Sequence, residues 1–451
     1  MKPFSLIIIL IAVMLFAGPV CAEAYNLYAL ACPFKTVADE ITYDEFVSTI
    51  NQSGEANNGI NAVYFSPSAA QDLGSIHQDW NLSIDENAAE KITDASGSLT
   101  CAVIPFEELT PEMKYIRVGQ EHYPWDKEYD PAGDVLAIPA QPGTYDRTKL
   151  TTLLMTGTTA LVRTTSYKMF VNGPLYPAEL MKPVFDDADI THVSNESSIW
   201  SLCPDPLNTF GIMQFCTQEN AYDLFDYLGV DVIELSGNHL RDYDWMPLLE
   251  MLNKFDEKEY HYYAAGRNFE EAARPLFMEH NGNNFVFLGC NIAGPDHVYV
   301  DERHPGVNHC DFDKMEQQIK DYAEQNYLVI VTVQYYETYS RVPTEKQERD
   351  FKRLSEAGAV VVSGSQAHYS QTMLPAKDRF IHYGLGNLFF DQMDTPVKGT
   401  SLEFLDKYVF YEGRLLNVQL ITTVLTDFAR PRLMDESERT EFLDEIFSLM
   451  N

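Results

Sequence analysis

Basic residues are scarce in this sequence. The chain has 451 residues, with 32 Lys and Arg against 67 Asp and Glu, which gives a formal net charge of -35. A chain of this charge repels phosphate groups over long distances, so nucleic acid is excluded as a partner and an anionic membrane surface is not expected to bind it. A polyanionic ligand would need a local cationic site. The acidity itself is typical of a solubilising surface.

Apolar runs long enough to cross a bilayer are also lacking. The run from Phe4 to Phe16 is shorter than the roughly 20 residues that a membrane-spanning helix needs. Lys2 precedes this run and the small residues Ala22 and Ala24 follow it, which is the pattern of a secretory signal. We therefore expect residues 1–24 to be a signal peptide and the protein to be exported, with a membrane attachment only if the signal stays uncleaved.

No two of the cysteines have the CxxC spacing of a zinc or redox site. Of the 7 cysteines, cleavage of the signal would remove Cys21 and leave an even number, which favours disulfides in an exported chain. Six cysteines allow fifteen sets of pairs. Because three couples lie in separate stretches of the sequence, we expect the pairs Cys32–Cys101, Cys203–Cys216 and Cys290–Cys310.

The chain is long enough for two structural units. The segment 126–143 is rich in Asp, Pro and Gly, which is typical of a boundary between two structural units. Residues 25–148 are therefore predicted to form a smaller α+β module. In this module, Pro33–Ile41 and Ile104–Leu109 weakly resemble half of a periplasmic solute-binding domain.

After residue 148 strands alternate with amphipathic helices, which predicts a layered α/β domain over 149–395 and a C-terminal extension, 396–451, that packs on it. Thr344 and Gln347 have capping-box spacing and Gly358 stands where a helix would stop, so a helix is predicted between them. A further strand is expected after the Asn281-Gly282 turn.

Five apolar runs in this domain are each followed at once by a small polar cluster. The runs are Leu153–Met155, Ile190–Val193, Val230–Leu235, Leu328–Val333 and Ala359–Val362. The clusters are Gly157-Thr158, Asn195-Glu196, Gly237-Asn238-His239, Gln334-Tyr335-Tyr336 and Gly364–His368. In an open α/β sheet the carboxyl ends of the strands meet in one crevice. The five clusters are therefore predicted to form a single site, although any one of them alone would more often be structural.

Two stretches in this region resemble the CapA family of poly-γ-glutamate capsule synthesis proteins. Leu235–Asp242 resembles the family's Asn-His motif, and Tyr383–Asp391 resembles its C-terminal signature nearly residue for residue. The family is similar to calcineurin-type metallophosphoesterases. The resemblance implies a calcineurin-like, metallophosphatase-type layered α/β fold over about 150–395 and a role in the synthesis or export of a surface polymer.

The sequence departs from the family's metal site at three positions. Thr158 stands where the family has Asp, and Gln334 and Gln366 each stand where it has His. Two-metal hydrolysis needs charged and imidazole ligands that hold two divalent ions close together. The resemblance leaves one divalent ion, or none, as the cofactor. Its ligands would be Glu196, Asn238 and His368, with Thr158, Gln334 and Gln366 as weak candidates.

Several other side chains in the clusters have two interpretations. His239 with Asp242 could be an acid/base pair or a hydrogen-bonded loop closure. Arg163 could clamp a phosphate or carboxylate group or form a surface ion pair. Asn195, Tyr335 and Tyr336 are candidates for ligand binding, and the alternative for the two tyrosines is packing.

Two functions from different classes follow. The first is a phosphoester hydrolase of cell-envelope polymers that uses His239, Asp242 and Arg163 with one metal ion. The second is a non-catalytic protein whose crevice binds a small molecule or a surface polymer. A third hypothesis is that the N-terminal module recruits a partner while the larger domain serves as a scaffold.

Overall fold

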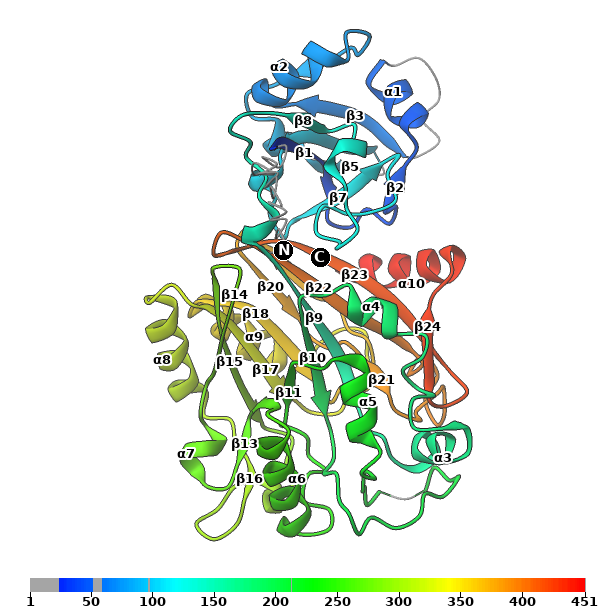
Figure 1. Cartoon of the computed structure of the whole chain (residues 1–451), viewed down its shortest axis with the longest axis vertical. Coiled ribbons are helices and arrows are strands. Elements are labelled where there is room, and N and C mark those ends of the chain that lie inside the picture. Colours follow the sequence, from blue (N-terminus) through cyan, green and yellow to red (C-terminus); the bar gives the residue numbers. More distant parts are fainter. Residues whose placement is uncertain (1–23, 52–58, 96–97, 212, 451) are drawn as a thin grey trace, which may run out of the picture.

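The computed structural model describes residues 24–51, 59–95, 98–211 and 213–450. The predicted signal peptide, except for its last residue, lies outside these ranges. Figure 1 shows a smaller module at the top and a larger domain below it. Within the described residues, no helix combines the length and the apolar character that crossing a bilayer would require.

The N-terminal module is a mixed sheet with two helices on one face. Its strands are ordered β2-β7-β1-β6-β3-β4, with β5 paired to β6 and β8 paired to β1. Phe46 of α1 and Leu73 of α2 pack in one apolar core with Phe65 of β3. The elements are β1 (Tyr25–Pro33), β2 (Glu40–Ile41), α1 (Tyr43–Asn51), β3 (Ile60–Phe65), α2 (Pro67–Ile76), β4 (Ser83–Ile84), β5 (Thr93–Ala95), β6 (Ser98–Pro105), β7 (Met113–Val118) and β8 (Ala137–Pro139).

The larger domain is built on two sheets. The first has the order β12-β11-β10-β9-β22-β23-β24, with β21 paired to β9, and the second has the order β14-β15-β17-β18-β20-β19. The first comprises β9 (Leu150–Thr159), β10 (Ile190–Asn195), β11 (Val232–Glu234), β12 (His261–Tyr263), β21 (Asn387–Phe389), β22 (Leu402–Tyr411), β23 (Arg414–Thr426) and β24 (Arg430–Leu433). The second comprises β14 (Leu276–His280), β15 (Asn283–Asn291), β17 (Leu328–Gln334), β18 (Ala359–Ser365), β19 (Met373–Ala376) and β20 (Arg379–His382).

The five apolar runs predicted as strands are therefore divided between two sheets. β9, β10 and β11 run parallel in the first sheet, and β17 and β18 run parallel in the second. The expectation of one continuous sheet was wrong, because apolar runs define strands but not the sheet that each strand joins.

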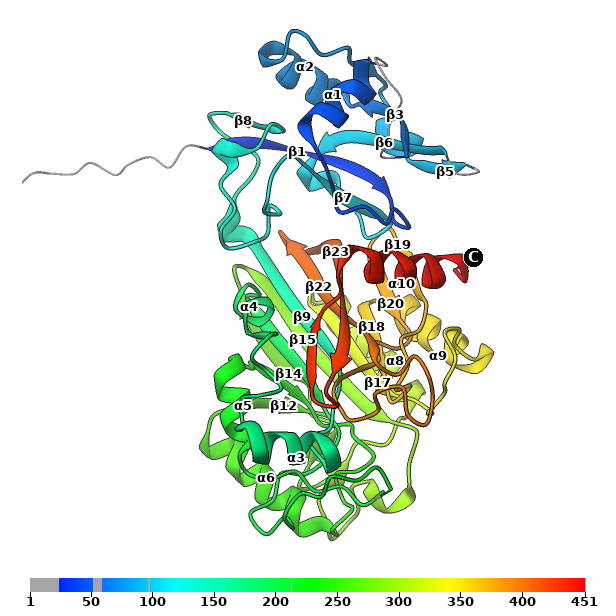
Figure 2. The ribbon, with the colours of Figure 1, turned by 90° about the vertical axis from the view of Figure 1, so that its right-hand side faces the viewer.

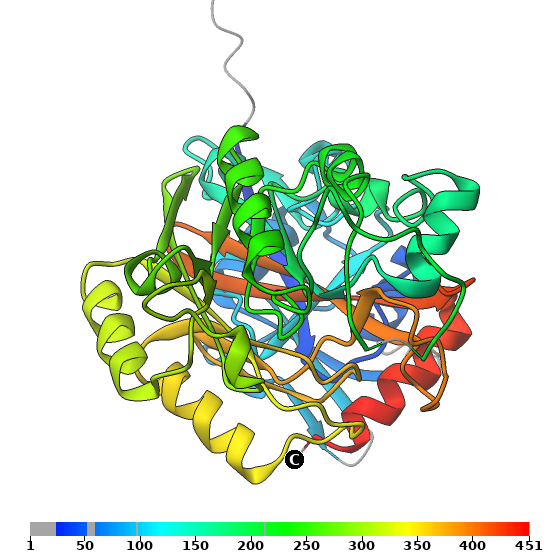
Figure 3. The same cartoon turned by 90° about the horizontal axis from the view of Figure 1, so that it is seen from below.

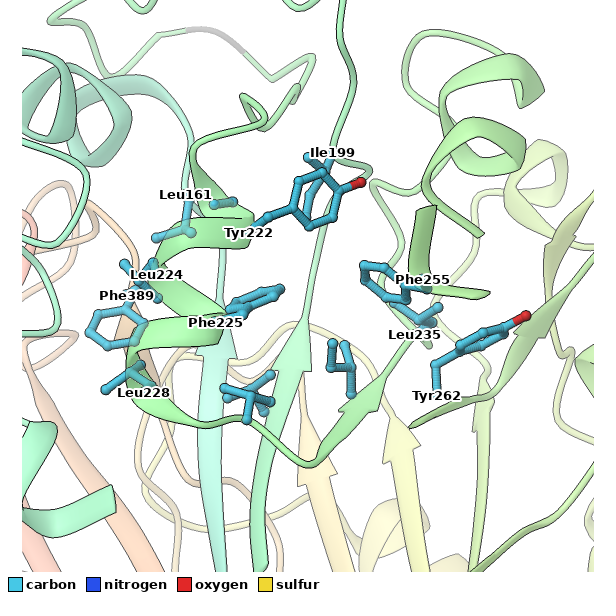
Figure 4. Close-up of a cluster of buried hydrophobic side chains, with 14 of the residues drawn as sticks. Leu161, Ile199, Tyr222, Leu224, Phe225, Leu228, Leu235, Phe255, Tyr262 and Phe389 are labelled. Carbon is cyan, nitrogen blue, oxygen red and sulfur yellow. The ribbon is translucent and has the colours of Figure 1, made fainter. Parts of the chain in front are cut away.

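Helices cover the outer faces of both sheets, which gives a layered α/β domain. Successive side chains along a strand point to opposite faces of its sheet. One face contributes to an inner core between the two sheets, which includes Leu153, Phe287 and Ile330, and the other face contributes to one of two outer cores beneath the helices. Seen from below, the strands lie between green helices on one side and yellow ones on the other (Figure 3). In Figure 4, Leu224, Phe225 and Leu228 of α5 belong to the first outer core. The predicted fold class is confirmed.

The helices that cover the first sheet are α3 (Arg163–Asn172), α4 (Lys182–Asp186), α5 (Ala221–Leu228) and α6 (Trp245–Glu257). Those over the second sheet are α8 (Phe312–Ala323) and α9 (Glu345–Glu356). The remaining elements are α7 (Phe269–Ala272), β13 (Ala265–Gly266), β16 (Gly306–Val307), α10 (Glu436–Ser448) and the 3-10 turns η1 (Ala88–Lys91), η2 (Phe106–Glu108), η3 (Pro131–Gly133), η4 (Arg147–Lys149) and η5 (Asp296–Val298).

Local sequence signals determine the ends of several elements. The Thr344 hydroxyl accepts a hydrogen bond from the Gln347 N–H and begins α9, and Gly358 follows its end with φ of 123°. Asn281 and Gly282 both have positive φ and form the β14–β15 turn. The three expected disulfides are formed, Cys32–Cys101, Cys203–Cys216 and Cys290–Cys310.

The C-terminal segment 396–451 is not an extension packed on a finished domain. β22 pairs antiparallel with β9 from Tyr411 opposite Leu150 to Asp406 opposite Met155, and β23 and β24 follow it in the same sheet. Without this segment β9 would lose a sheet neighbour. The boundary expected at residue 395 therefore falls inside the domain.

The N-terminal module sits at the end of the domain where β9 begins. Figure 2 shows the module at this end of the domain. Trp125 and Tyr115 of the module pack with Leu150, Tyr411 and Leu416. β9 has 10 residues, so at about 3.3 Å per residue its carboxyl end is about 30 Å from this contact. The module thus lies far from the strand ends where the polar clusters were predicted to meet.

A charged group reinforces this contact. The Asp39 carboxylate lies 2.7 Å from Lys114 Nζ within the module and 2.8 Å from Arg439 Nη2 on α10. Burial alone would raise the pKa of Asp39, but the two cations outweigh it and the pKa lies below its usual value. Burial lowers the pKa of Lys114 to about 8.

We predict that Asp39→Asn lowers the free energy of unfolding at neutral pH by about 2 kcal/mol, because hydrogen bonds to charged groups contribute roughly that much and Lys114 loses its counter-charge. Since the pKa of Asp39 is lowered by folding, its stabilisation is present above about pH 4 and is lost as the pH falls through the folded value. Urea unfolding with intact disulfides should show wild type and variant converging in acid. Asp79→Asn, at an exposed aspartate of the same module, is the control; a difference from wild type that persists in acid would contradict the assignment.

Candidate functional site

The Gln334 amide lies where the two sheets meet, within the largely buried group of polar side chains that we call the crevice. Its Nε2 lies 3.4 and 3.3 Å from the two carboxylate oxygens of Glu196 and 3.2 Å from Asn238 Oδ1, and it contacts Gln366 Oε1. Its Oε1 accepts a hydrogen bond from Ser365 Oγ at 3.0 Å. Gln334 and Glu196 are both 0% exposed. The nitrogen of a neutral amide, which has two hydrogens to donate, therefore faces a group of oxygens that come from both sheets.

Close backbone contact brings these loops together. A Cβ on Gly237 would lie 2.3 Å from the carbonyl oxygen of Glu196, and one on Gly157 would lie 2.3 Å from that of Gly386. Only glycine allows such an approach. Thr158 is buried beside Gly157, and its hydroxyl has no hydrogen-bond partner among the described residues.

His368 is oriented by Asn387. Asn387 Nδ2 donates to the backbone oxygens of His368 and Thr400, which leaves Oδ1 to face His368 Nδ1 at 2.8 Å. Nδ1 of His368 therefore carries the proton, and Nε2 is the nitrogen left to accept a proton or bind a metal ion. The backbone of His368 has φ of 50°, in the left-handed region that costs a non-glycine residue about 1–3 kcal/mol.

His239 forms the predicted pair with Asp242. Its Nδ1 lies 2.6 Å from Asp242 Oδ2, and the same carboxylate oxygen accepts a hydrogen bond from the backbone N–H of Phe215 at 2.6 Å. The imidazole ring stacks on the Phe215 ring with centroids 3.8 Å apart. The carboxylate fixes which imidazole nitrogen is protonated, so the geometry suits either proton transfer or a rigid hydrogen-bonding contact.

Arg163 is held in a buried ion pair with Asp391. Its Nε lies 3.1 Å from Asp391 Oδ1, its Nη2 contacts the same oxygen, and the Thr164 N–H donates to Oδ2 at 3.1 Å. Burial raises the pKa of Asp391, and the Arg163 charge opposes this shift. The pair is buried, unlike the surface ion pair that the sequence offered as the alternative to an anion clamp.

Two predicted ligand-binding residues point away from the crevice. The Asn195 amide donates to the Ser197 carbonyl at 2.9 Å and lies near Met251 of α6. The Tyr335 hydroxyl donates to Asp350 of α9 at 2.8 Å, and Tyr335 is only 2% exposed. The reason is the alternation of side chains along a strand, which sends Asn195 and Tyr335 into the helix layers when Glu196 and Gln334 face the crevice. Tyr336 is 46% exposed.

Other residues of the site are missed by reasoning from the sequence. In the sequence, Asn387 is typical of a turn residue, although it lies in the signature stretch Tyr383–Asp391. Asp391 is the last residue of that stretch, and its position indicates no role. Phe215 has no signal beyond its neighbour Cys216. Glu234 is also missed: it is buried beneath the crevice, and burial raises its pKa above the usual value.

The donor set does not fit a pair of divalent ions. It contains one carboxylate, one imidazole and several amides, and the Gln334 nitrogen, not its oxygen, faces Glu196. Amide nitrogens do not bind hard cations, which prefer oxygen ligands. Within the described residues, no group of three or more His, Cys, Asp or Glu side chains is arranged to hold a metal ion.

Comparison with known proteins assigns the family. The family model for "Bacterial capsule synthesis protein PGA_cap" matches residues 152–392, more than half of the chain. The chain belongs to the PGA_cap family. The resemblance to CapA proteins stated from the sequence is confirmed.

Two curated relatives of this PGA_cap chain are CapA proteins. It is 30% identical over 178 residues to a Capsule biosynthesis protein CapA from Bacillus anthracis, covering 39% of this chain and 43% of the relative. It is 23% identical over 190 residues to a PGA biosynthesis protein CapA from Bacillus subtilis (strain 168), covering 41% and 49%. The matched region thus spans about half the length of the curated relatives.

Solved structures that are similar to this PGA_cap chain share little sequence with it. A hypothetical protein from Thermus thermophilus is 15% identical with a TM-score of 0.38, covering 60% of this chain and 98% of its own. A 5'-nucleotidase precursor from the same organism is 15% identical with a TM-score of 0.38, covering 67% and 60%. A Haemophilus influenzae NAD nucleotidase is 10% identical with a TM-score of 0.36, covering 67% and 57%.

We predict that Gln334→Leu lowers the free energy of unfolding by about 1–3 kcal/mol, because it leaves the buried Glu196 carboxylate without this donor. Adding Glu196→Gln should recover part of the loss by removing the charge. Urea unfolding of the two single variants and the double variant measures this coupling, and Gln317→Leu on the surface of α8 is the control. A double variant no more stable than Gln334→Leu alone would disprove the proposed contact.

Proposed function

We propose that this protein is exported to the cell envelope and takes part in making or moving a capsule polymer, poly-γ-glutamate or a related one, by binding it rather than cleaving it. In this proposal the crevice at the strand ends holds a segment of the polymer or its small-molecule unit. The observation that carries the proposal is the Gln334 amide, whose nitrogen faces the oxygens of Glu196, Asn238 and Gln366.

The chemistry of that amide favours binding over metal-assisted hydrolysis. Two-metal hydrolysis depends on two divalent ions that hold the attacking and leaving oxygens. The Gln334 amide neutralises no charge and cannot activate water. A set of amides, one carboxylate and one imidazole offers hydrogen-bond donors and acceptors instead, which suits the amide groups of a polymer. The carboxylates of a polyanionic polymer would lie outside this set, because Arg163 is already paired with Asp391.

Family membership and disulfides support the cellular side of the proposal. The family description and both curated relatives refer to capsule or PGA synthesis. The three disulfides would persist in an oxidising compartment, as expected outside the cytoplasm.

The second candidate is a hydrolase that uses a single metal ion. It is favoured by the His239–Asp242 pair at 2.6 Å, which could move a proton, and by the tautomer of His368 that Asn387 selects. Glu196, Asn238 and His368 would be the ligands, and the Gln334 amide would have to turn its oxygen inwards.

Metal analysis of the full chain, purified without chelator, separates the two. We expect substoichiometric divalent metal and no hydrolysis of bis(p-nitrophenyl) phosphate by the wild type. The variant Thr158→Asp/Gln334→His/Gln366→His, which restores the family's ligands, should bind Mn²⁺ and be stabilised by about 2.7 kcal/mol at a hundred times its Kd. Stoichiometric metal in the wild type, with hydrolysis that is lost in His239→Ala, would establish the second candidate instead.

Binding is tested with poly-γ-glutamate of defined length as the probe. We expect the polymer to raise the melting temperature of the wild type, and Gln366→Ala to weaken the effect because this amide lies at the crevice. Gln317→Ala, on the surface of α8, should bind as the wild type does. An unchanged melting temperature, together with no heat of binding by calorimetry, would count against the polymer as ligand.

A further inference from the structure

A connected series of ring contacts links the two histidines of the crevice. His239 stacks on Phe215 with centroids 3.8 Å apart, and His368 lies 5.2 Å from Phe390. The central carbon of the Arg163 guanidinium is 4.9 Å from the Phe215 centroid and 4.8 Å from that of Phe390. One charged, planar group therefore touches both rings that support the histidines.

Hydrogen bonds to Asp391 along one edge of this guanidinium fix its orientation. Asp391 binds it through Nε and Nη2, and Asp391 itself is 0% exposed while the Arg163 side chain is 7% exposed. An arginine bound along its edge by a carboxylate keeps its flat faces for aromatic contacts. Cations over aromatic rings are attracted by the ring quadrupole, more strongly when water is excluded.

The backbone at this position is held in an unfavourable conformation. Arg163 begins α3 with φ of 48°, a value that is uncommon outside glycine. Such a conformation persists only where the surrounding contacts impose it. The ion pair with Asp391 and the two ring contacts are contacts of this kind.

We propose that Arg163 and Asp391 are positioning residues that, together with the hydrogen bonds to Asp242 and Asn387, hold both histidines in place through Phe215 and Phe390. In this arrangement Arg163 does not clamp an anionic ligand, because its charge is already satisfied by a buried carboxylate. Its effect on ligand binding is exerted through the rings, which hold His239 and His368 facing the crevice. Any role of the two histidines in ligand binding rests on the proposed function. Their positioning by Arg163 and Asp391 does not depend on it.

The series has a branching pattern that can be tested. Arg163 contacts both rings, whereas each ring supports one histidine. Arg163→Lys keeps the charge but loses the planar group, so it should displace both histidines. The two rings also contact each other edge to face, with centroids 5.7 Å apart. Phe215→Leu should therefore displace His239 more than His368, and Phe390→Leu should displace His368 more than His239.

The measurement uses the full chain, labelled with ¹³C at histidine Cε1, at one pH and with chelator present so that metal plays no part. His239→Gln and His368→Gln assign the two resonances. We expect Arg163→Lys to reduce the ring-current displacement of both resonances, and each phenylalanine variant to reduce mainly that of the histidine its ring contacts. Arg267→Lys is the matched control, since Arg267 pairs with Asp256 and Glu271 away from the series, and should move neither.

Resonances of the other histidines report whether each variant is folded. If Arg163→Lys fails to fold, Asp391→Asn replaces it, with the same expectation for both resonances. An Arg163 or Asp391 variant that stays folded and shifts neither histidine, or only one, overturns the proposal. Failure of the wild type to bind poly-γ-glutamate would refute the proposed function while leaving this pattern of shifts intact.

Discussion

The arrangement of the crevice depends on one constraint, the packing of two sheets against each other through a shared apolar core. Leu153 from the first sheet and Phe287 and Ile330 from the second belong to that core. Because the sheets cannot slide without opening it, their carboxyl ends are fixed side by side. Glu196 and Gln334, which are 138 residues apart in sequence, are brought within hydrogen-bonding distance by this packing.

The electrostatic character of the crevice follows from what occupies its centre. Glu196 is a buried carboxylate, and a buried charge needs hydrogen bonds or a counter-charge. Here the donor is a glutamine amide, while the nearby arginine is committed to Asp391. The crevice therefore combines a buried acid with neutral amides.

Much of this could be predicted from the sequence, and the failures have physical causes. Apolar runs, the Thr344 cap and the Asn281-Gly282 turn predicted elements correctly, because these signals are local. The assignment of all five strands to one sheet was wrong, because the choice between one sheet and two depends on contacts between distant segments.

The polar clusters predicted which loops form the crevice, but not which way each side chain points. Asn195 and Tyr335 were predicted to face the crevice, but they point away from it. Side chains alternate along a strand, so the direction of each can be predicted only when the direction of one of them is known. Phe215 and Asp391 act through contacts with Arg163, and such contacts leave no spacing signal.

The three disulfides of the described residues each lie inside one unit, Cys32–Cys101 in the module and the other two in the larger domain. The boundary between the units is crossed instead by apolar packing and by the pair Asp39–Arg439. Acid and reducing agents should therefore act on different parts of the molecule. Acid weakens the contact between the module and the larger domain and leaves the disulfides in place. A reductant breaks the disulfides inside each unit and does not act directly on the contact between the units.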